Sequence, residues 1–269
     1  PFGHYIFDEL KRQGIGTDTI KYDNVYKTGI QLKEFVEDGR DPYAPYYRKE
    51  SAAAHVSKDD IDNINLTDIE LIHVTGIPPA LSSTALEATV RLMERAKDNG
   101  IKLTFDPNLR PALWESQESM IYEINRLSEL ADVVLPGIKE CQILLGTENK
   151  EKIAAYYHKQ GISTVVIKDG KNGAFISERK GKNILQMMVP GYHVNHVIDT
   201  VGAGDGFAVG FLSGMLEGLS VKECAERANA IGALQVQHRG DNEGLPNRKQ
   251  LAEAMHKMKR EIQKGTKVL

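Results

Sequence analysis

The chain of 269 residues has few cysteines, no long apolar run and almost no net charge. Cys141 and Cys224 are the only cysteines, and they stand far apart and in no metal-ligand spacing. This pattern excludes a disulfide framework and indicates reduced thiols in a cytoplasmic protein. No apolar run approaches the ~20 residues that cross a bilayer. A formal net charge of −3 gives no reason to expect a nucleic acid or an anionic membrane as a partner.

The chain also lacks an opening strand. It starts at Pro1 without a methionine, and apolar residues at helical spacing predict a helix from Phe2 to Gln13. Because an α/β domain rarely begins in the middle of its layers, we expect the natural protein to continue upstream with further N-terminal strands.

From residue 69 onward, apolar strands alternate with helices. This alternation predicts a mainly parallel sheet with helices on both faces, and the ligands of such sheets bind beyond the carboxyl ends of the strands. The strands are expected at residues 69–74, 101–105, 132–135, 164–168, 174–177 and 184–189. The helices are expected at residues 82–99, 116–130, 140–145, 150–160, 221–237 and 247–263, with a further apolar helix after residue 204.

Ahead of this alternation, residues 29–36 and 43–48 have strand character and flank the turn signal Asp38-Gly39. Neither strand is apolar enough to sit in a core, so we expect a small antiparallel sheet that projects from the main domain. The chain is therefore divided into a discontinuous core, residues 1–21 and 58–269, and a projecting segment, residues 22–57.

The most informative stretch is a glycine-rich turn at the start of an apolar helix. Gly202, Ala203 and Gly204 leave backbone N–H groups uncovered at the positive end of the helix dipole, which favours an anion. Asp205 lies within this turn, where its carboxylate either caps the helix or takes a proton from a hydroxyl next to a phosphate. The P-loop is excluded because no Gly-Lys-Ser/Thr follows, and Phe207 breaks the dinucleotide fingerprint.

Glycine recurs at every fourth position along this helix, at residues 202, 206, 210, 214 and 218. Each interior glycine costs roughly 1 kcal/mol relative to alanine. For Gly210 and Gly214 we expect the reason to be close packing of the helix on the sheet.

Residues 199–207, Asp-Thr-Val-Gly-Ala-Gly-Asp-Gly-Phe, resemble the C-terminal signature of the ribokinase-like (PfkB) carbohydrate kinases at every specified position. The resemblance implies a three-layer ribokinase-like fold with a small β-sheet lid, which residues 22–57 would form, and the use of ATP and Mg²⁺. It implies that Asp205 is the general base, with the amides of residues 202–205 holding the transferred phosphoryl group. It also implies a monovalent cation such as K⁺ near Asp199 and Thr200.

The turn Lys168-Asp169-Gly170-Lys171-Asn172-Gly173 joins two expected strands, which is sufficient reason for its two glycines. In the family the equivalent turn lies beside the nucleotide. The resemblance therefore also makes Lys168, Gly170 and Gly173 candidate ATP contacts, together with Gly202 and Gly204 of the glycine-rich turn.

Two further positions have an ordinary explanation beside the implied one. Asn229 resembles a family residue at the adenine, although an asparagine on a helix is commonly a capping or solvated residue. Glu140 corresponds to the glutamate of the family's Asn-x-x-Glu, which organises Mg²⁺ through water, although it also fits an ordinary first-turn acid. Gly137 replaces the asparagine of that motif.

The implied sugar site draws on a loop after an expected strand. Two prolines stiffen the stretch that follows Phe105, so Asp106, Asn108 and Arg110 are expected to project at the carboxyl edge of the sheet. The stretch resembles the Asp-x-Asn-x-Arg of the 2-keto-3-deoxygluconate kinase branch. Arg110 would there face the substrate or the phosphates, and a guanidinium suits the carboxylate of a sugar acid.

The projecting segment carries the second part of this implied site. Tyr46-Tyr47-Arg48 resembles the lid of that branch, which implies substrate contacts for Tyr46 and Arg48. The alternative is that this Tyr-x-Arg strand is an exposed strand without a functional role. Gln31 departs from the aromatic residue that many relatives carry at its position.

The function implied by these motifs is an ATP-dependent kinase acting on the 6-hydroxyl of 2-keto-3-deoxygluconate. Another kinase of the family, for fructose, ribose or 5-dehydro-2-deoxygluconate, is the nearest alternative. A non-catalytic sugar or nucleotide sensor on the same fold is the alternative of another class, against which the intact Asp205 argues. The exposed edge of the lid also suggests a homodimer or higher homo-oligomer.

Overall fold

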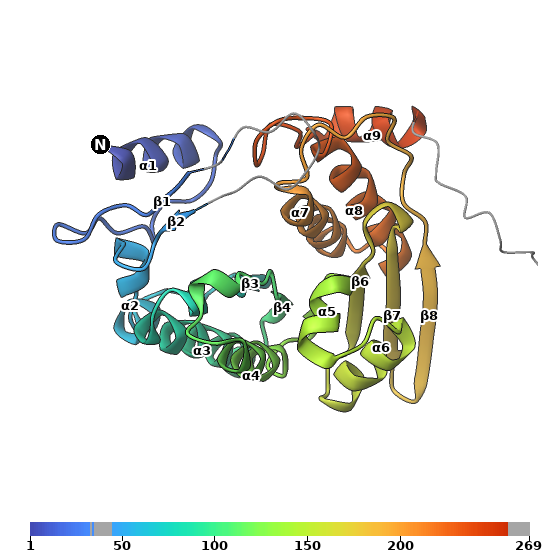
Figure 1. The fold of residues 1–269 in the computed structure, drawn as a ribbon, viewed down its shortest axis with the longest axis horizontal. Helices are drawn as coiled ribbons and strands as arrows, with labels where there is room; N and C mark the ends of the chain where they lie inside the picture. Colours follow the sequence, from blue (N-terminus) through green and yellow to red (C-terminus); the bar gives the residue numbers. More distant parts are fainter. Residues whose placement is uncertain (33, 35–44, 258–269) are drawn as a thin grey trace, which may run out of the picture.

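The computed structural model describes residues 1–32, 34 and 45–257, and Figure 1 shows their arrangement. The main sheet has the strand order β3-β4-β5-β6-β7-β8, in which β3 to β6 are parallel and β7 and β8 are added antiparallel. The mainly parallel sheet expected from the sequence is confirmed. Its strands are β3 (Leu71–Thr75), β4 (Lys102–Asp106), β5 (Val133–Val134), β6 (Thr164–Lys168), β7 (Ala174–Lys180) and β8 (Asn183–Val189).

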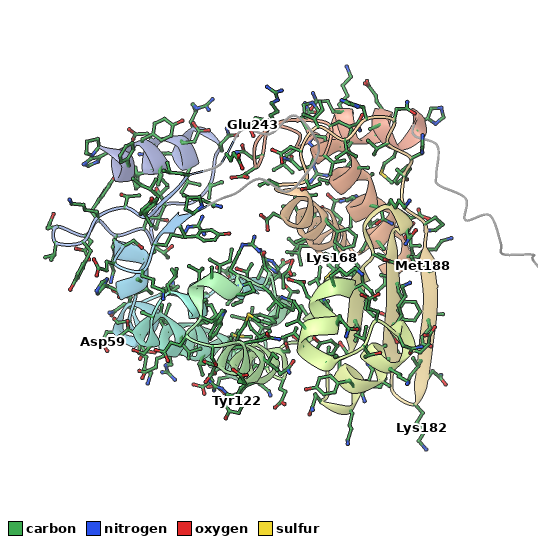
Figure 2. The ribbon with its side chains drawn as sticks, in the orientation of Figure 1. Asp59, Tyr122, Lys168, Lys182, Met188 and Glu243 are labelled. Carbon is green, nitrogen blue, oxygen red and sulfur yellow. The ribbon has the colours of Figure 1, made fainter. Side chains whose placement is uncertain are left out.

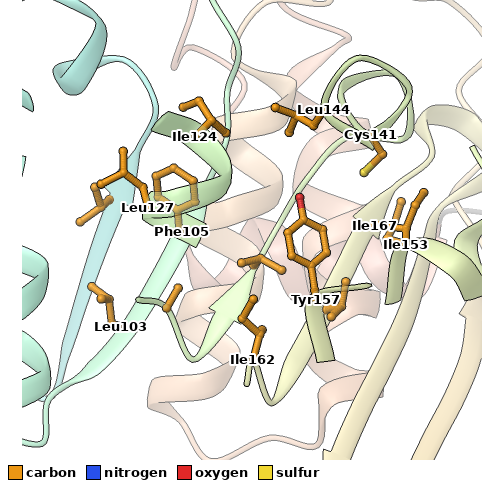
Figure 3. Packing of buried hydrophobic residues seen from close by; sticks show 14 of the residues in the cluster. Leu103, Phe105, Ile124, Leu127, Cys141, Leu144, Ile153, Tyr157, Ile162 and Ile167 are labelled. Atoms are coloured by element: carbon orange, nitrogen blue, oxygen red, sulfur yellow. The ribbon is translucent and has the colours of Figure 1, made fainter. Parts of the chain in front are cut away.

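Helices cover both faces of this sheet. Val134 belongs to one buried cluster with Phe105 and Tyr157, shown in Figure 3, whereas its neighbour Val133 belongs to a second cluster with Phe211. Successive strand residues point to opposite faces, so the two clusters are the cores of two layers. The first contains α3 (Ser83–Asp98), α4 (Gln117–Ser128), α5 (Ile138–Leu145) and α6 (Lys150–Lys159), and the second contains α7 (Ala203–Leu216) and α8 (Val221–Gln235). Helix α9 (Arg248–Lys257) follows α8.

Hydrogen-bonded caps place most helix ends close to the predicted positions. The Ser82 hydroxyl accepts a hydrogen bond from the N–H of Ala85 at 3.0 Å, which starts α3 where its sequence predicts. Helix α5 begins earlier than predicted, at Ile138. The reason is that the Glu140 carboxylate accepts the N–H of Gly137 at 2.6 Å. This hydrogen bond makes Gly137 the N-cap, so the helix begins at Ile138.

The N-terminal part that the structure describes contains two α-helices and a 3-10 helix, Ala52–His55. Helix α1 (Phe2–Arg12) confirms the helix predicted there, but its apolar residues are not buried, and Phe2 is 61% exposed. The sequence pattern does not predict α2 (Lys58–Asp62), which begins with reciprocal hydrogen bonds between Ser57 and Asp60. Of the helices that the structure describes, none is long and apolar enough to cross a bilayer.

A separate two-stranded sheet consists of β1 (Ile30–Gln31) and β2 (Tyr46–Tyr47), which pair antiparallel. The small antiparallel sheet expected near the N-terminus is therefore present. The predicted strands extend further, to residues 36 and 43, but residues 33 and 35–44 lie outside the described residues. The boundaries of the lid segment, residues 22–57, stay a prediction.

Gly210 and Gly214 of α7 face another helix rather than the sheet. A Cβ atom on Gly210 would lie 2.5 Å from the Cα of Ala228, and one on Gly214 would lie 2.8 Å from the sulfur of Cys224. Both neighbours belong to α8. The expected packing on the sheet is wrong, because it is the backbones of two helices that approach too closely here for any side chain between them.

A half-buried histidine, His73 on β3, has its Nδ1 atom 2.8 Å from the hydroxyl oxygen of Thr104 on β4. Burial, followed by the positive charge of Lys168, lowers the pKa of His73 to about 4 from an ordinary value of 6.5. The folded chain therefore holds a neutral imidazole at pH values where the unfolded chain binds a proton. The neutral His73 side chain therefore contributes fully to the free energy of unfolding above pH 6.5. That contribution is lost as the pH falls toward 4, because the unfolded chain binds the proton more readily.

His73→Gln should make the free energy of unfolding less dependent on pH between 6.5 and 5. The amide can still pair with Thr104 but takes up no proton, so the slope due to His73, at most about 2 kcal/mol over this range, should disappear. Urea unfolding of both proteins at several pH values measures the difference. Parallel pH profiles for the two proteins would show that His73 titrates alike in the folded and unfolded chains.

Candidate active site

The glycine-rich turn forms the N-terminus of α7. Gly202 is the N-cap with a φ of 76°, and a Cβ atom there would lie 2.2 Å from the carbonyl oxygen of Asp241. Only glycine fits, because the backbone conformation is left-handed and the segment around residue 241 lies directly against it. The turn from Gly202 to Asp205 thus presents helix-terminal amides, in the way the sequence predicts for an anion site.

Asp205 lies in the first turn of α7 and is exposed. Among the described residues its carboxylate accepts a hydrogen bond from the side-chain amide of Asn108, at 3.4 Å. The N-terminus of α7 has no side-chain cap. Of the two explanations for Asp205, the geometry favours a carboxylate available to a ligand over a helix cap.

A buried ion pair lies beside this turn. The Nζ of Lys168, at the end of β6, is 2.6 Å from a carboxylate oxygen of Asp106, at the end of β4. The same Nζ lies 3.9 Å from the position that a Cβ atom of Gly204 would take. In the view of Figure 2, Lys168 lies just below α7.

Asp106 does not project from the sheet edge, so the prediction made from the sequence is wrong at this residue. It is 1% exposed, because Lys168 covers it and its other carboxylate oxygen accepts the N–H of Asn108 at 3.2 Å. Burial raises the pKa of Asp106 to about 6. Burial also opposes the charge of Lys168, but the nearby carboxylates of Asp106 and Glu140 outweigh it, and the pKa of Lys168 is raised.

Glu140 joins two loops at the carboxyl edge of the sheet. One of its oxygens accepts the N–H of Leu109 at 2.7 Å and the other accepts the N–H of Gly137 at 2.6 Å. The ordinary explanation of Glu140 as an acid in the first turn of a helix is therefore confirmed, and the same side chain also fixes the loop after β4. A role in organising Mg²⁺ through water stays a prediction.

The two predicted arginines lie in different parts of the molecule. The Nη1 of Arg110 donates to the carbonyl oxygen of Leu109 at 2.9 Å, so this side chain folds over its own loop. The guanidinium of Arg48 lies 5.0 Å from the ring centroid of Tyr46 and donates to the amide oxygen of Gln31 at 2.8 Å. The structure groups Tyr46 and Gln31 of the two-stranded sheet with Arg48, which directly follows β2, and this sheet lies across from α7 in Figure 1.

A cavity of about 490 Å³ brings most of the predicted ATP contacts together. This volume is ordinary for a small-molecule site. Lys168 and Gly204 line the end that adjoins the glycine-rich turn. The predicted ATP contacts that line it are Lys168, Gly170, Gly173, Gly204 and Asn229. Thr200, predicted at a cation, and Ala203, predicted at the transferred phosphoryl group, line it too. Gly202 is not among the lining residues, although it begins the helix that carries Ala203 and Gly204.

Sequence reasoning missed the apolar wall of this cavity. The wall comes from the segment after β8, from α7 and from the C-terminal end of α8, and these three parts come together only in the fold. Its members are Tyr192, Val194, Val197, Phe207, Ala233 and Val236. Hollows of about 990 and 760 Å³ beside the N-terminal segment do not adjoin the glycine-rich turn.

The turn at the mouth of this cavity has the predicted conformation. Gly170 and Gly173 have φ values of 52° and 98°, as the hairpin explanation requires. Asn229 is 7% exposed, and its side-chain amide donates to the carbonyl oxygens of Val189 and Pro190 at 3.1 Å each. Asn229 therefore anchors the end of β8 as well as lining the cavity.

The predicted cation contacts hold the loop before α7. The carboxylate of Asp199 accepts the N–H of Val201 at 3.1 Å and that of Gly240 at 3.3 Å, and Thr200 lines the cavity. No group of three or more His, Cys, Asp or Glu side chains with metal-binding geometry occurs within the described part of the chain. A role for Asp199 and Thr200 at a monovalent cation stays a prediction.

Comparisons with known proteins agree with this geometry. The 2-dehydro-3-deoxygluconokinase of Bacillus subtilis (strain 168) is 45% identical over 251 residues, which are 93% of this chain and 76% of that protein. The crystal structure of a PfkB protein from Polaromonas sp. JS666 is 39% identical, with a TM-score of 0.82 over 93% of this chain and 78% of that one.

A fructokinase from Vibrio cholerae O395, in a form with bound fructose, ADP and calcium ion, is 27% identical, with a TM-score of 0.85 over 95% of this chain and 82% of that one. The expected ribokinase-like fold and the kinase class are thereby confirmed. The model of the pfkB family carbohydrate kinases matches residues 1–248. This chain belongs to the pfkB family of carbohydrate kinases.

Proposed function

We propose that this sugar kinase transfers the γ-phosphoryl group of ATP to the 6-hydroxyl of 2-keto-3-deoxygluconate, which is also called 2-dehydro-3-deoxygluconate. The observation that carries the proposal is the exposed Asp205 carboxylate at the N-terminus of α7, next in the chain to Gly204, which lines a nucleotide-sized cavity. The choice of sugar is supported by the 45% identity to the 2-dehydro-3-deoxygluconokinase of B. subtilis.

In the proposed reaction Asp205 accepts the proton of the sugar hydroxyl while the hydroxyl oxygen forms a bond to the γ-phosphorus. The bond between the γ-phosphorus and the bridging oxygen breaks, and its electron pair leaves with ADP. Charge on the transferred group is stabilised by the amides of Gly202, Ala203 and Gly204 and by the ammonium of Lys168. Positioning and charge stabilisation are what such a transfer needs.

The residues of the cavity fit ATP with Mg²⁺. Glycines at 170, 173 and 204 leave room for phosphates, and apolar side chains line the rest of the cavity. Mg²⁺ commonly keeps several waters and binds substrate phosphates with one or two carboxylates, so the lack of a cluster of acidic ligands within the described residues suits it. Glu140 would hold it through water, and the metal would neutralise phosphate charge.

Arg48, Tyr46 and Arg110 are the proposed sugar contacts. The preference for a sugar acid is supported by two guanidinium groups, since a guanidinium binds a carboxylate bidentately. Residues 22–57 would act as a lid that excludes water when the sugar binds. We further propose that the exposed edge of the two-stranded sheet, where Tyr47 is 63% exposed, joins copies of the chain in a homodimer or higher homo-oligomer.

A substrate panel tests the choice of sugar. Purified protein is given ATP, Mg²⁺ and each of 2-keto-3-deoxygluconate, fructose, ribose and 5-dehydro-2-deoxygluconate, and ADP release is followed. We expect the highest kcat/KM for 2-keto-3-deoxygluconate and a 6-phosphate product by NMR. Faster turnover of fructose would replace this proposal with the fructokinase alternative, which the similarity to the V. cholerae enzyme supports.

Gln31→Leu should raise the KM for the sugar acid about fivefold and change kcat less than twofold. Gln31 holds the guanidinium of Arg48 by a hydrogen bond at 2.8 Å on an exposed surface, where such a bond contributes about 1 kcal/mol. Steady-state kinetics measures the change. Gln13→Leu, which removes another exposed glutamine with a side-chain hydrogen bond, to Glu9, is the control and should leave KM unchanged. An equal rise for both variants contradicts a specific role for Gln31.

A further inference from the structure

The ion pair between Asp106 and Lys168 is the most buried charged contact next to the candidate active site. Their side chains are 2% and 17% exposed, and the two residues end strands β4 and β6, which flank the short strand β5. The mechanism proposed above gives Lys168 a role at the phosphoryl group but gives none to Asp106.

Asp106 connects the parts of that site that carry charge. One carboxylate oxygen accepts from Lys168, whose Nζ lies beside Gly204, and the other accepts the N–H of Asn108, whose side chain donates to Asp205. The cation and the predicted base are therefore both linked to the same buried carboxylate.

Stability alone is a weak reason for such a pair. Desolvation of two buried charges offsets much of their attraction, and apolar residues of similar volume often serve the fold as well. A lysine without a partner in this position would tend to lose its proton, and its four-carbon stem would leave the ammonium free to move. The ion pair with Asp106 therefore keeps the Lys168 ammonium charged and holds it in a fixed position.

We propose that Asp106 is a positioning residue for phosphoryl transfer, because its carboxylate holds the Lys168 ammonium beside Gly204, against the group being transferred. This inference rests on the proposed function. The raised pKa of Lys168 agrees with it, since the amine stays protonated while it is paired.

Asp106→Asn tests the proposal with little change of shape. The new amide keeps an oxygen for the N–H of Asn108 but loses the charge that holds Lys168. We expect kcat to fall about tenfold, with the KM for the sugar changed less than twofold. The matched control is Asp132→Asn, because Asp132 also accepts a backbone N–H, from Leu103, and pairs with a lysine, Lys102 at 3.7 Å, away from the site. Its kcat should stay unchanged. An undiminished kcat in the folded Asp106→Asn protein overturns the proposal.

A double-mutant cycle separates positioning from a merely structural effect. Lys168→Met removes the cation at similar volume and should lower kcat about ten- to a hundredfold. If Asp106 acts through Lys168, the protein with Lys168→Met and Asp106→Asn together should be no slower than the one with Lys168→Met alone. Independent, multiplying losses would mean that Asp106 serves the structure only. The double variant contains neither buried charge, so it can fold even if Asp106→Asn does not.

Nucleotide affinity, measured without turnover, is a second test of where the Lys168 ammonium lies. Calorimetry on each variant compares ADP with a non-hydrolysable ATP analogue. Asp106→Asn should weaken the analogue about fivefold or more and ADP less than twofold, because Lys168 is placed at the transferred group. Equal weakening of both nucleotides contradicts that placement. Absence of sugar phosphorylation by the wild-type protein would instead refute the proposed function and leave the binding comparison interpretable.

Discussion

Asp205→Asn is expected to lower kcat about 10²- to 10⁴-fold while the protein stays folded. Asparagine has nearly the same shape but cannot accept the hydroxyl proton, and general-base catalysis contributes roughly this factor. The side chain is exposed and its one described partner is the amide of Asn108, so the loss of charge leaves no buried group without a partner. Steady-state kinetics and thermal unfolding of the same samples measure both effects.

The control for this experiment is an acid that caps a helix. Glu223, in the first turn of α8, accepts the N–H of Ser220 at 2.9 Å. Glu223→Gln should lower the unfolding temperature slightly and leave kcat unchanged. If Asp205→Asn behaves in the same way, with a small loss of stability and full turnover, Asp205 is a structural acid and another group must take the proton.

Gly202→Ala is expected to cost about 2–5 kcal/mol of unfolding free energy and about a hundredfold in kcat. The left-handed φ of 76° accounts for about 1–2 kcal/mol of this cost, and the overlap of the new Cβ with the carbonyl oxygen of Asp241 accounts for the rest. Relief of that overlap must displace the amides that we propose hold the phosphoryl group. Chemical denaturation and kinetics measure the two losses.

Gly218→Ala separates the two causes. Gly218 follows α7 with a φ of 71°, and a Cβ atom there would meet nothing within 4 Å. It should cost only the conformational part, about 1–2 kcal/mol, and leave kcat unchanged. Equal stability losses for both variants would mean that the contact between Gly202 and Asp241 has no effect of its own.

Local signals in the sequence predict much of the fold. The strand expected at residues 164–168 has those bounds in the structure, because a buried apolar run ends there at a turn with two glycines. Helix α3 begins where a serine cap predicts. Such features depend on neighbouring residues alone. The glycine-rich turn at the start of α7 belongs to the same class.

What the sequence does not predict depends on residues far apart in the chain. Asp106 and Lys168 are 62 positions apart, and only the strand order brings their side chains to 2.6 Å. The spacing of Gly210 and Gly214 indicates that one face of α7 is tightly packed, but not which element lies against it. The apolar wall of the cavity combines a segment without periodicity after β8 with residues of α7 and α8, so no single pattern in the sequence marks it.

The close approach of α7 and α8 makes the active site sensitive to changes far from it. Gly214 lies twelve residues beyond Gly202, about 18 Å along the helix axis, and its backbone rests on Cys224. A change at this contact can therefore tilt α7 as a rigid rod. A tilt of a few degrees at the far end would swing the amides of the glycine-rich turn by about 1 Å, and errors of that size are enough to slow catalysis. The contact between α7 and α8 thus contributes to the accuracy of the site, in addition to the contact between Gly202 and Asp241.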